Sequence, residues 1–373
     1  MLCRGHGLQK VGRRLLQMRC LQTVGTVQSV QSGGDAAHGV PDEFVDSFGR
    51  KHDYLRISLT ERCNLRCTYC MPEDGVQLQP DDKLLDDEQV LRLVAAFVRN
   101  GVNKVRLTGG EPLLRKSIVS LCGQIKDLGV QDLAITTNGI LLKRKLEPLA
   151  DVGVNLLNIS LDTLVEPKFE LITRRRGFKQ VLSSIEKASV HPGLDRVKVN
   201  CVVKRGMNDD ELLDFVELSR NLNIEVRFIE YMPFDGNKWS SKGLLPYYEM
   251  ADRIKEKFPT FSRTKSLDSK NTVSKTWQVP GFVGTIGFIS SMSDHFCGSC
   301  NRIRLTADGN IKACLFGSEE VSLRDAMNSG ASDDELVQLI RQTVYRKHEK
   351  LGGHETPESI SLGENRPMIL IGG

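Results

Sequence analysis

Three cysteines lie close together near the start of the chain, in the spacing Cys-x3-Cys-x2-Cys formed by Cys63, Cys67 and Cys70. At this spacing three thiolates can point at one metal centre. A structural zinc site normally takes four protein ligands, whereas a cubane iron–sulfur cluster held by three thiolates keeps one iron free of protein ligands. An open metal position suits catalysis. The alternative interpretation is a zinc site whose fourth ligand comes from a distant residue.

A second group of cysteines stands near the other end of the chain, at Cys297, Cys300 and Cys314. A strand predicted over 303–307, a turn at 308–310 containing Asp-Gly, and a return strand would bring Cys314 back beside the other two. His295 is the only nearby candidate for a fourth ligand. This group is therefore either a three-cysteine, one-histidine zinc knuckle or a second cluster with an open iron. Six of the ten cysteines fall into these two groups, and the sequence shows no secretory signal. Both features favour metal or cofactor ligation over disulfide bonds.

The segments between the two groups alternate between strand and helix patterns, as judged from hydrophobic periodicity and capping residues. Strands are predicted over 55–59, 104–108, 133–137, 156–161, 197–203 and 225–230. Helices are predicted over 86–100, 118–128, 141–152, 178–189 and 209–221. Strands separated by helices in this way predict a parallel sheet with right-handed crossovers. Beyond about residue 235 the pattern changes: 262–276 is polar and predicted as a loop, and 282–290 is predicted as a strand.

Polar and apolar residues alternate along the predicted strands. In the first strand Arg56 and Ser58 share one face, whereas Leu55 and Ile57 share the other, and the next four strands repeat this pattern. A doubly wound sheet that is buried on both faces would be continuously apolar. The polar face instead predicts an α/β fold with a partial six-stranded (βα) barrel whose interior holds a ligand. A C-terminal extension would carry the second cysteine group.

The predicted inner face is also cationic, because several strands place a basic residue on it: Arg56, Lys104, Arg106 and Lys198. Burying unpaired cations is costly, so an anionic ligand should meet them, and their number suggests phosphates. The alternative is pairing with nearby carboxylates, namely Glu111, Asp162 or Glu230. Arg302 and Arg304 are two residues apart on a predicted strand and therefore point the same way. They would either extend this anion site or be ordinary surface arginines.

Composition limits the class of protein. The chain has 373 residues, a net charge of +4, 40% apolar residues and no long apolar run, which indicates a globular protein that does not span a membrane and gives no sign of nucleic-acid binding. Residues 1–34 contain no Asp or Glu but several Arg and Lys interleaved with apolar residues. This predicts a mitochondrial transit peptide, the alternative being a disordered basic tail. We therefore divide the chain into a transit segment at 1–40, a barrel at 41–235 and a C-terminal region at 236–373.

The combination of motifs resembles a known family. Cys-x3-Cys-x2-Cys after a first strand, with Tyr69 before the last cysteine, is similar to the radical S-adenosylmethionine (SAM) superfamily. Two three-cysteine groups flanking a six-stranded barrel resemble its GTP 3′,8-cyclase family of molybdenum cofactor biosynthesis, in an animal mitochondrial form. The matching stretches are 55–67, 106–113, 136–139, 158–162, 197–200, 227–232, 296–304 and the terminal 372–373.

The resemblance implies roles for individual residues. One [4Fe-4S] cluster would be held by Cys63, Cys67 and Cys70, and a second one, whose open iron takes the guanine, by Cys297, Cys300 and Cys314. SAM would be contacted by Tyr69, Gly110, Ser160 and Met232, with the segment 109–112 at its amino-acid end. GTP would be bound by Arg56, Arg106, Thr136, Lys198, Arg302, Ile303 and Arg304. Catalysis would involve Arg56, Arg302, Arg304 and the tail glycines Gly372 and Gly373, since in the family this tail enters the active site.

The resemblance also implies a reaction and partners. A deoxyadenosyl radical made from SAM would take the ribose 3′ hydrogen of GTP, and the resulting carbon radical would attack C8 of the purine. The product, 3′,8-cyclo-7,8-dihydro-GTP, would pass to a separate cyclic pyranopterin monophosphate synthase. The resemblance further implies that an electron donor acts with the protein, that the protein forms a homodimer and that it is located in the mitochondrial matrix. Two alternatives are a radical SAM enzyme that modifies a peptide and a non-catalytic zinc-binding adaptor, although peptide-modifying enzymes usually carry more cysteines in their auxiliary domain.

Overall fold

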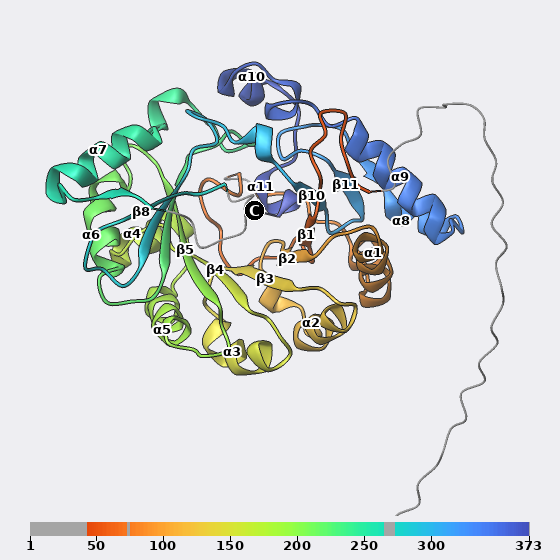
Figure 1. Cartoon of the computed structure of the whole chain (residues 1–373), viewed down its shortest axis with the longest axis horizontal. Helices are drawn as coiled ribbons and strands as arrows, with labels where there is room; N and C mark the ends of the chain where they lie inside the picture. Colours follow the sequence, from red (N-terminus) through yellow and green to blue (C-terminus); the bar gives the residue numbers. More distant parts are fainter. Residues whose placement is uncertain (1–42, 73–74, 265–272, 373) are drawn as a thin grey trace, which may run out of the picture. The chain divides into compact units, whose positions relative to one another are not determined.

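The alternating strands and helices fold into one curved sheet with helices packed along its outer side (Figure 1). The computed structural model describes residues 43–72, 75–264 and 273–372. Val40–Gly373 forms one compact unit. The predicted transit segment lies outside the described residues, as does Gly373. Within the described ranges, no helix is both long and apolar enough to cross a bilayer.

The described strands join in the order β12-β11-β10-β1-β2-β3-β4-β5-β6-β9-β8-β7. Their bounds are β1 (Tyr54–Ser58), β2 (Lys104–Thr108), β3 (Asp132–Thr137), β4 (Leu156–Ser160), β5 (Arg196–Val203), β6 (Glu225–Glu230), β7 (Ser262–Arg263), β8 (Lys275–Gln278), β9 (Thr285–Ile289), β10 (Arg302–Leu305), β11 (Asn310–Lys312) and β12 (Val321–Ser322). The six predicted barrel strands are β1 to β6, and they run parallel in sequence order. This part of the fold prediction is confirmed.

The helices are α1 (Asp87–Arg99), α2 (Ile118–Asp127), α3 (Leu142–Asp151), α4 (Glu166–Thr173), α5 (Phe178–Ser189), α6 (Leu212–Leu218), α7 (Tyr247–Lys257), α8 (Leu323–Asn328), α9 (Asp333–Tyr345), α10 (Pro357–Leu362) and α11 (Met368–Ile371). Capping fixes the start of α1, where the Asp86 side chain accepts a hydrogen bond from Gln89 N at 2.8 Å. The sequence prediction placed α1, α2, α3 and α5 to within about two residues. It missed α4, which is too short to show a clear period.

The C-terminal region adds strands to both edges of the barrel strands, which the sequence did not indicate. β10 pairs in parallel with β1, and β9 pairs in parallel with β6. The polar segment predicted as a loop begins with β7 and ends in β8, which pair with each other in antiparallel fashion. That prediction was therefore wrong at both ends, while 265–272 lies outside the described residues. The boundary placed at residue 235 stays a prediction.

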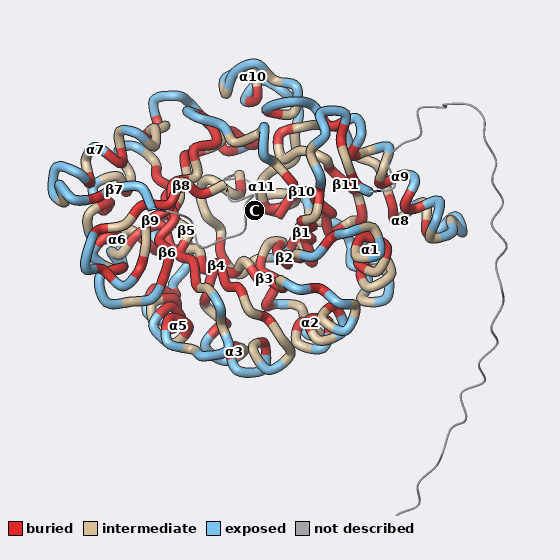
Figure 2. Tube along the Cα trace, in the orientation of Figure 1, coloured by how far each residue is buried: buried red, intermediate tan, exposed pale blue. Residues whose placement is uncertain are grey.

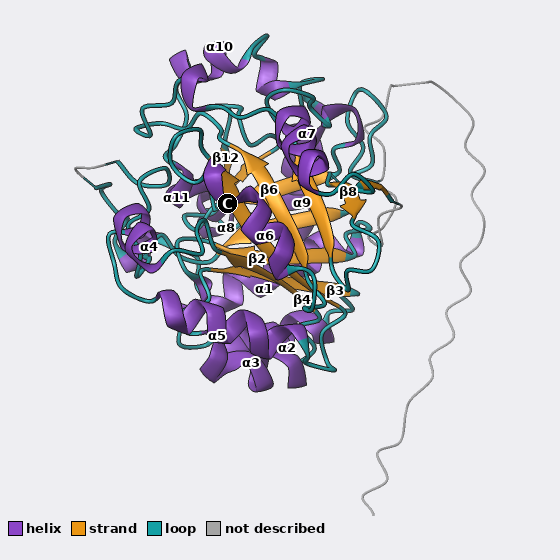
Figure 3. Ribbon diagram, turned by 90° about the vertical axis from the view of Figure 1, so that its left-hand side faces the viewer, coloured by secondary structure: helices purple, strands orange, loops and turns teal. Residues whose placement is uncertain are grey.

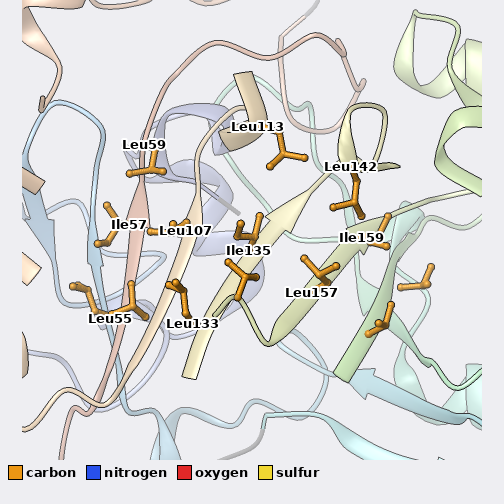
Figure 4. Packing of buried hydrophobic residues seen from close by; sticks show 14 of the residues in the cluster. Leu55, Ile57, Leu59, Leu107, Leu113, Leu133, Ile135, Leu142, Leu157 and Ile159 are labelled. Carbon is orange, nitrogen blue, oxygen red and sulfur yellow. The ribbon is translucent and has the colours of Figure 1, made fainter. Parts of the chain in front are cut away.

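The apolar faces of the strands pack against the helices. Figure 2 shows burial concentrated on the strands and on the inward sides of the helices, and Figure 3 shows α2, α3 and α5 together on one side of the sheet. In Figure 4, Leu55 and Ile57 of β1 lie beside Leu107 of β2 and Ile135 of β3. All four side chains are fully buried. Burial of a leucine or isoleucine contributes about 1.5–3 kcal/mol, so this layer fixes which strand face remains for the interior.

Candidate active site

The inner face of the sheet lines a cavity of about 240 Å³. The lining from the barrel strands includes the residues that alternation assigned to this face: Arg56, Lys104, Arg106, Thr136, Asn158, Ser160, Lys198 and Asn200. Arg302 and Arg304 join them from β10, so they are not surface arginines. The loop after β1 contributes Cys63, Cys67 and Cys70. Cationic and thiol groups therefore face one shared space.

Strand register sets three arginines side by side in this cavity. Arg56 of β1 is level with Arg304 of β10 and with Arg106 of β2. Arg302 lies two residues before Arg304 on β10, lines the same cavity and extends this arginine row. Burial, together with the charges of Arg56 and Arg302, lowers the pKa of Arg304 to about 9. Like charges on neighbouring strands repel and destabilise the sheet. The folded chain retains this row at a cost in stability, which points to an anion that binds there.

Several polar atoms of this row are buried with no hydrogen-bond partner among the described residues, namely Arg56 Nε, Arg302 Nε and Nη2, and Arg304 Nη1. Thr136 Oγ1 on β3 is also buried without a hydrogen-bond partner among the described residues. Buried donors without a partner are rare and costly in folded proteins. Guanidinium groups donate in a planar fork that matches phosphate oxygens. The site therefore fits a phosphorylated ligand.

The carboxylates that could have neutralised the row are engaged elsewhere. Glu111 accepts from Thr137 Oγ1 at 2.8 Å and from Asn138 N at 2.7 Å, and burial raises its pKa to about 7. Asp162 accepts from Tyr69 Oη at 2.8 Å. Glu230 accepts from Met292 N at 2.7 Å. Lys104 pairs with Asp132 at 3.1 Å, a carboxylate that the sequence analysis did not name.

Sequence reasoning missed Tyr54, which lies two residues before Arg56 and shares its strand face. Its ring is within 5.5–5.7 Å of three cationic groups, those of Lys104, Arg106 and Arg56. Burial raises the pKa of Tyr54, but the charges of Arg106, Arg56 and Lys104 outweigh burial and lower it to about 7. The strand alternation that assigned Arg56 to the inner face also assigns Tyr54 to it. An aromatic residue at the start of a strand more often belongs to the hydrophobic core, so this signal was not used.

Replacing Tyr54 with phenylalanine is expected to remove a pH dependence of triphosphate binding. As pH rises through about 7 the Tyr54 hydroxyl loses its proton, and the new negative charge weakens binding of phosphates by up to about tenfold per pH unit. The dissociation constant for a nucleoside triphosphate should therefore rise more steeply with pH in the native protein than in Tyr54→Phe. Because ionisation of the nucleotide is common to both proteins, parallel pH profiles would contradict the prediction.

The loop that carries the first cysteine group is fixed against α4. Arg66 N donates to Thr173 O at 2.9 Å, and Thr68 N donates to Ile172 O at 3.0 Å. Burial raises the pKa of the Cys67 thiol, and the charges of Cys70 and Cys63 raise it further, so the three sulfurs act on one another. The described cysteines are free thiols. Thiols that raise one another's pKa repel as thiolates, and a cationic metal centre would relieve that repulsion.

The glycines that follow β2 allow a close approach of two chain segments. Gly110 N donates to Thr60 O at 2.7 Å, and a Cβ on Gly110 would meet Arg62 O at 2.3 Å. The segment thus runs directly alongside the start of the cysteine loop, and only glycine fits there. Gly109 and Gly110 line the cavity, as do Tyr69, Ser160 and Met232. Glu111 and Pro112 are buried outside the lining, so the expectation that all of 109–112 faces a cofactor is too broad.

The second cysteine group lies beside Arg302 and Arg304. Burial raises the pKa of the Cys300 thiol, but the charges of Arg302 and Lys347 outweigh burial and lower it to about 6. The charges of Cys314 and Cys300 both act on Cys297, so the hairpin does bring Cys314 back to the group. His295 is exposed. Among the described residues, no three His, Cys, Asp or Glu side chains are grouped closely enough to hold a single metal ion, and this applies to both cysteine groups.

Ile303 lies between these two arginines on β10 and points the other way. Its side chain is fully buried in the hydrophobic core and does not line the cavity. This follows from strand alternation. A contact between Ile303 and a substrate would have to come from its backbone.

The end of the chain returns to the cavity. Figure 1 shows α11 inside the curve of the sheet, and Met368 and Ile369 of this helix line the cavity. The Cys70 thiol donates to Met368 Sδ at 3.7 Å. Gly372 has φ +80°, and a Cβ there would meet Thr108 Oγ1 at 2.4 Å and Ser58 Cβ at 3.1 Å. Only glycine fits this position without displacing β1 or β2 residues.

The variant Gly372→Ala is expected to lower turnover at least tenfold, because the added methyl has no room beside Thr108 and Ser58 and displaces the end of the tail from the cavity. Turnover and unfolding are measured on the same preparation. Gly123→Ala is the matched control. Gly123 lies inside α2, where alanine is favoured over glycine, and its new Cβ would be in ordinary contact with Val152 at 3.6 Å. Unchanged turnover in Gly372→Ala would rule out a role for the tail.

Two family models match the chain. The model of the Radical SAM superfamily matches residues 57–219, and the model described as Molybdenum Cofactor Synthesis C matches residues 224–352. Among solved structures, SuiB of Streptococcus suis bound to S-adenosylmethionine aligns with a TM-score of 0.52 at 16% identity, covering 78% of this chain and 68% of that one. The anSMEcpe structure with bound AdoMet has the same TM-score at 16% identity, covering 85% and 93%. These likenesses support the fold alone.

Curated relatives share more of the sequence. Molybdenum cofactor biosynthesis protein 1 of Dictyostelium discoideum is 55% identical over 330 residues, which is 88% of this chain and 52% of that protein. This chain thus spans about half the length of the relatives of that name. The mitochondrial GTP 3′,8-cyclase of Arabidopsis thaliana is 51% identical over 94% of this chain and 91% of its own length. The GTP 3′,8-cyclase of Thermodesulfovibrio yellowstonii is 41% identical over 88% and 99%. The chain therefore belongs to the GTP 3′,8-cyclase family of the radical SAM superfamily.

Proposed function

We propose that this chain converts GTP to (8S)-3′,8-cyclo-7,8-dihydroguanosine 5′-triphosphate, the first step of molybdenum cofactor biosynthesis. The observation that carries the proposal is the register that sets Arg304, Arg56 and Arg106 side by side in the cavity that Cys63, Cys67 and Cys70 also line. A site with both features can hold a triphosphate within reach of a metal centre. Family membership supports the same activity.

The arginine row would bind the triphosphate. Its unpartnered donors on Arg56, Arg302 and Arg304 supply forked hydrogen bonds to phosphate oxygens, and Lys198 on β5 adds a buried positive charge. Thr136 Oγ1 offers a donor toward the ribose or phosphates. Because these groups come from four strands of one sheet, the nucleotide would be held rigidly, which favours a reaction at one ribose carbon.

The two cysteine groups would each hold one [4Fe-4S] cluster, and SAM would lie near Tyr69, Gly110, Ser160 and Met232. When bound, the first cluster and SAM would supply the radical chemistry that removes the ribose 3′ hydrogen of GTP. The chain's own contribution is orientation and exclusion of water. Tyr69 is held by its bond to Asp162, and α11 with Gly372 closes the cavity beside Cys70.

The product would pass to a separate cyclic pyranopterin monophosphate synthase, and an electron donor would reduce the clusters. We also propose a homodimer in the mitochondrial matrix, in an animal form of the family. The acid-free, arginine-containing N-terminal sequence and the mitochondrial name of the Arabidopsis relative support this location.

The test is an anaerobic assay of the iron-reconstituted chain with SAM, dithionite and a panel of nucleotides. Formation of 5′-deoxyadenosine that depends on GTP, in step with loss of GTP, is the expected result. Formation of 5′-deoxyadenosine that no nucleotide influences would contradict the substrate and favour a peptide-modifying enzyme. A preparation that binds zinc and no iron would contradict the enzymatic function altogether.

A further inference from the structure

One buried lysine contacts both the second cysteine group and the arginine row. Lys347 follows α9 and is 4% exposed. Its Nζ donates to Cys300 Sγ at 3.2 Å and to Arg302 O at 3.1 Å. A single ammonium group thus joins a predicted cluster ligand to the strand residue that faces the nucleotide site. Neither cysteine spacing nor strand alternation points to Lys347, which is 47 residues from Cys300.

The third contact of the Lys347 ammonium group is with a histidine, which orients it. Lys347 Nζ lies 2.9 Å from His52 Nε2, and His52 is fully buried. Burial and the charge of Lys347 lower the pKa of His52 to about 3, so the imidazole is neutral and its Nε2 accepts the hydrogen bond. Nε2 also lies 3.7 Å from a carboxylate oxygen of Asp46. The three N–H donors of the lysine therefore have three fixed acceptors, in Cys300, Arg302 and His52.

The same two segments also hold the neighbouring cysteine. Arg50 Nη1 donates to Cys297 O at 2.8 Å, while its Nε donates to Asp46 Oδ2 at 2.6 Å. Leu351 N donates to Cys297 Sγ at 3.5 Å. Residues 46–52 and 347–351 thus form a clasp around Cys297 and Cys300. Both thiols receive an N–H donor from the segment that follows α9.

We propose that Lys347 is a positioning residue of the C-terminal iron–sulfur centre. Its ammonium group raises the reduction potential of that centre and fixes Cys300 relative to Arg302. The inference rests on the proposed function in one respect, that Cys297, Cys300 and Cys314 hold a cluster. Hydrogen bonds to ligand sulfurs and nearby positive charge stabilise the more negative, reduced form of a cluster. Loss of the ammonium should therefore make the centre harder to reduce.

The test isolates the C-terminal centre in the full chain. The parent protein carries Cys63→Ser, Cys67→Ser and Cys70→Ser, so that paramagnetic resonance reports one centre, and its potential is titrated anaerobically. Lys347→Met and Lys347→Gln remove the charge, Lys347→Arg retains it, and Lys350→Met is the control, because Lys350 is exposed in the same segment. We expect the ratio of reduced to oxidised centre at a fixed potential to fall at least tenfold in both neutral variants, or about 59 mV for one electron.

Lys347→Arg should recover part of the shift, and Lys350→Met should show none. Loss of iron from a folded neutral variant, with retention in Lys347→Arg, would also support the role. An unchanged potential in either neutral variant that folds and holds iron would overturn it. A parent that takes up no iron at Cys297, Cys300 and Cys314 would contradict the second cluster itself, and this inference with it. An unshifted potential in the neutral variants, together with normal GTP turnover by a chain that keeps Cys63, Cys67 and Cys70, would contradict this inference alone.

Discussion

Serine in place of Cys67 is expected to abolish formation of 5′-deoxyadenosine and to halve the iron content of the reconstituted chain. Cys67 is one of three thiols of the first cysteine group that line the cavity, and burial together with the charges of Cys70 and Cys63 raises its pKa. With only two thiolates, the first centre would lose its protein anchor, while the group around Cys300 would be untouched. Iron content, the visible absorption of the clusters and the yield of 5′-deoxyadenosine are measured together.

The control for this result is Cys122→Ala. Cys122 is fully buried in α2, where its thiol packs among apolar residues and does not line the cavity described above. Loss of its sulfur should reduce stability by about 1 kcal/mol and leave iron content and turnover unchanged. If Cys67→Ser retained full iron and produced 5′-deoxyadenosine, the assignment of the first cysteine group would be wrong.

Glutamine in place of Arg304 is expected to weaken GTP binding while the ligand-free protein keeps or gains stability. A charge-assisted hydrogen bond to a phosphate contributes about 1.5–3 kcal/mol, so its loss should raise the dissociation constant roughly 10- to 150-fold. Without ligand, the same substitution removes a buried cation from beside Arg56 and Arg302, which already depress its pKa. Relief of this repulsion offsets the lost packing.

Two measurements check this pair of effects, namely equilibrium binding of GTP and the thermal unfolding midpoint of the free protein. Arg144→Gln serves as the control, because Arg144 is exposed on the outer side of α3 and should affect neither quantity. A large fall in the stability of Arg304→Gln with unchanged affinity would mean that the arginine row is structural. Stability that is kept while affinity falls is what a site built for an anion should show.

The inner face of the barrel could be predicted from the sequence because it depends on a local rule. Side chains alternate along a strand, so Arg56, Arg106 and Lys198 could be assigned to one face from their spacing to apolar neighbours alone. The apolar partners, such as Leu55 and Leu107, are accordingly buried under the helices. The cysteine spacing is local in the same way.

Other parts of the site depend on contacts that no local pattern encodes. The parallel pairing of β10 with β1 joins residues almost 250 positions apart, and it alone sets Arg304 level with Arg56. The contact of Lys347 with His52 spans 295 residues. The family resemblance implied that Glu111 lies at the cofactor together with the two glycines before it, yet its carboxylate is buried against Thr137 and Asn138. Such placements follow from tertiary structure and not from sequence periodicity.

The most direct test of the account follows one hydrogen atom. GTP that carries deuterium at the ribose 3′ position is incubated anaerobically with the reconstituted chain, SAM and dithionite, and the mass of the 5′-deoxyadenosine is measured. If the shared cavity holds the triphosphate on the arginine row within reach of the first centre, one deuterium should appear in each 5′-deoxyadenosine, and the label should vanish from the cyclised product. Unlabelled 5′-deoxyadenosine formed while GTP stays intact would contradict the proposed reaction.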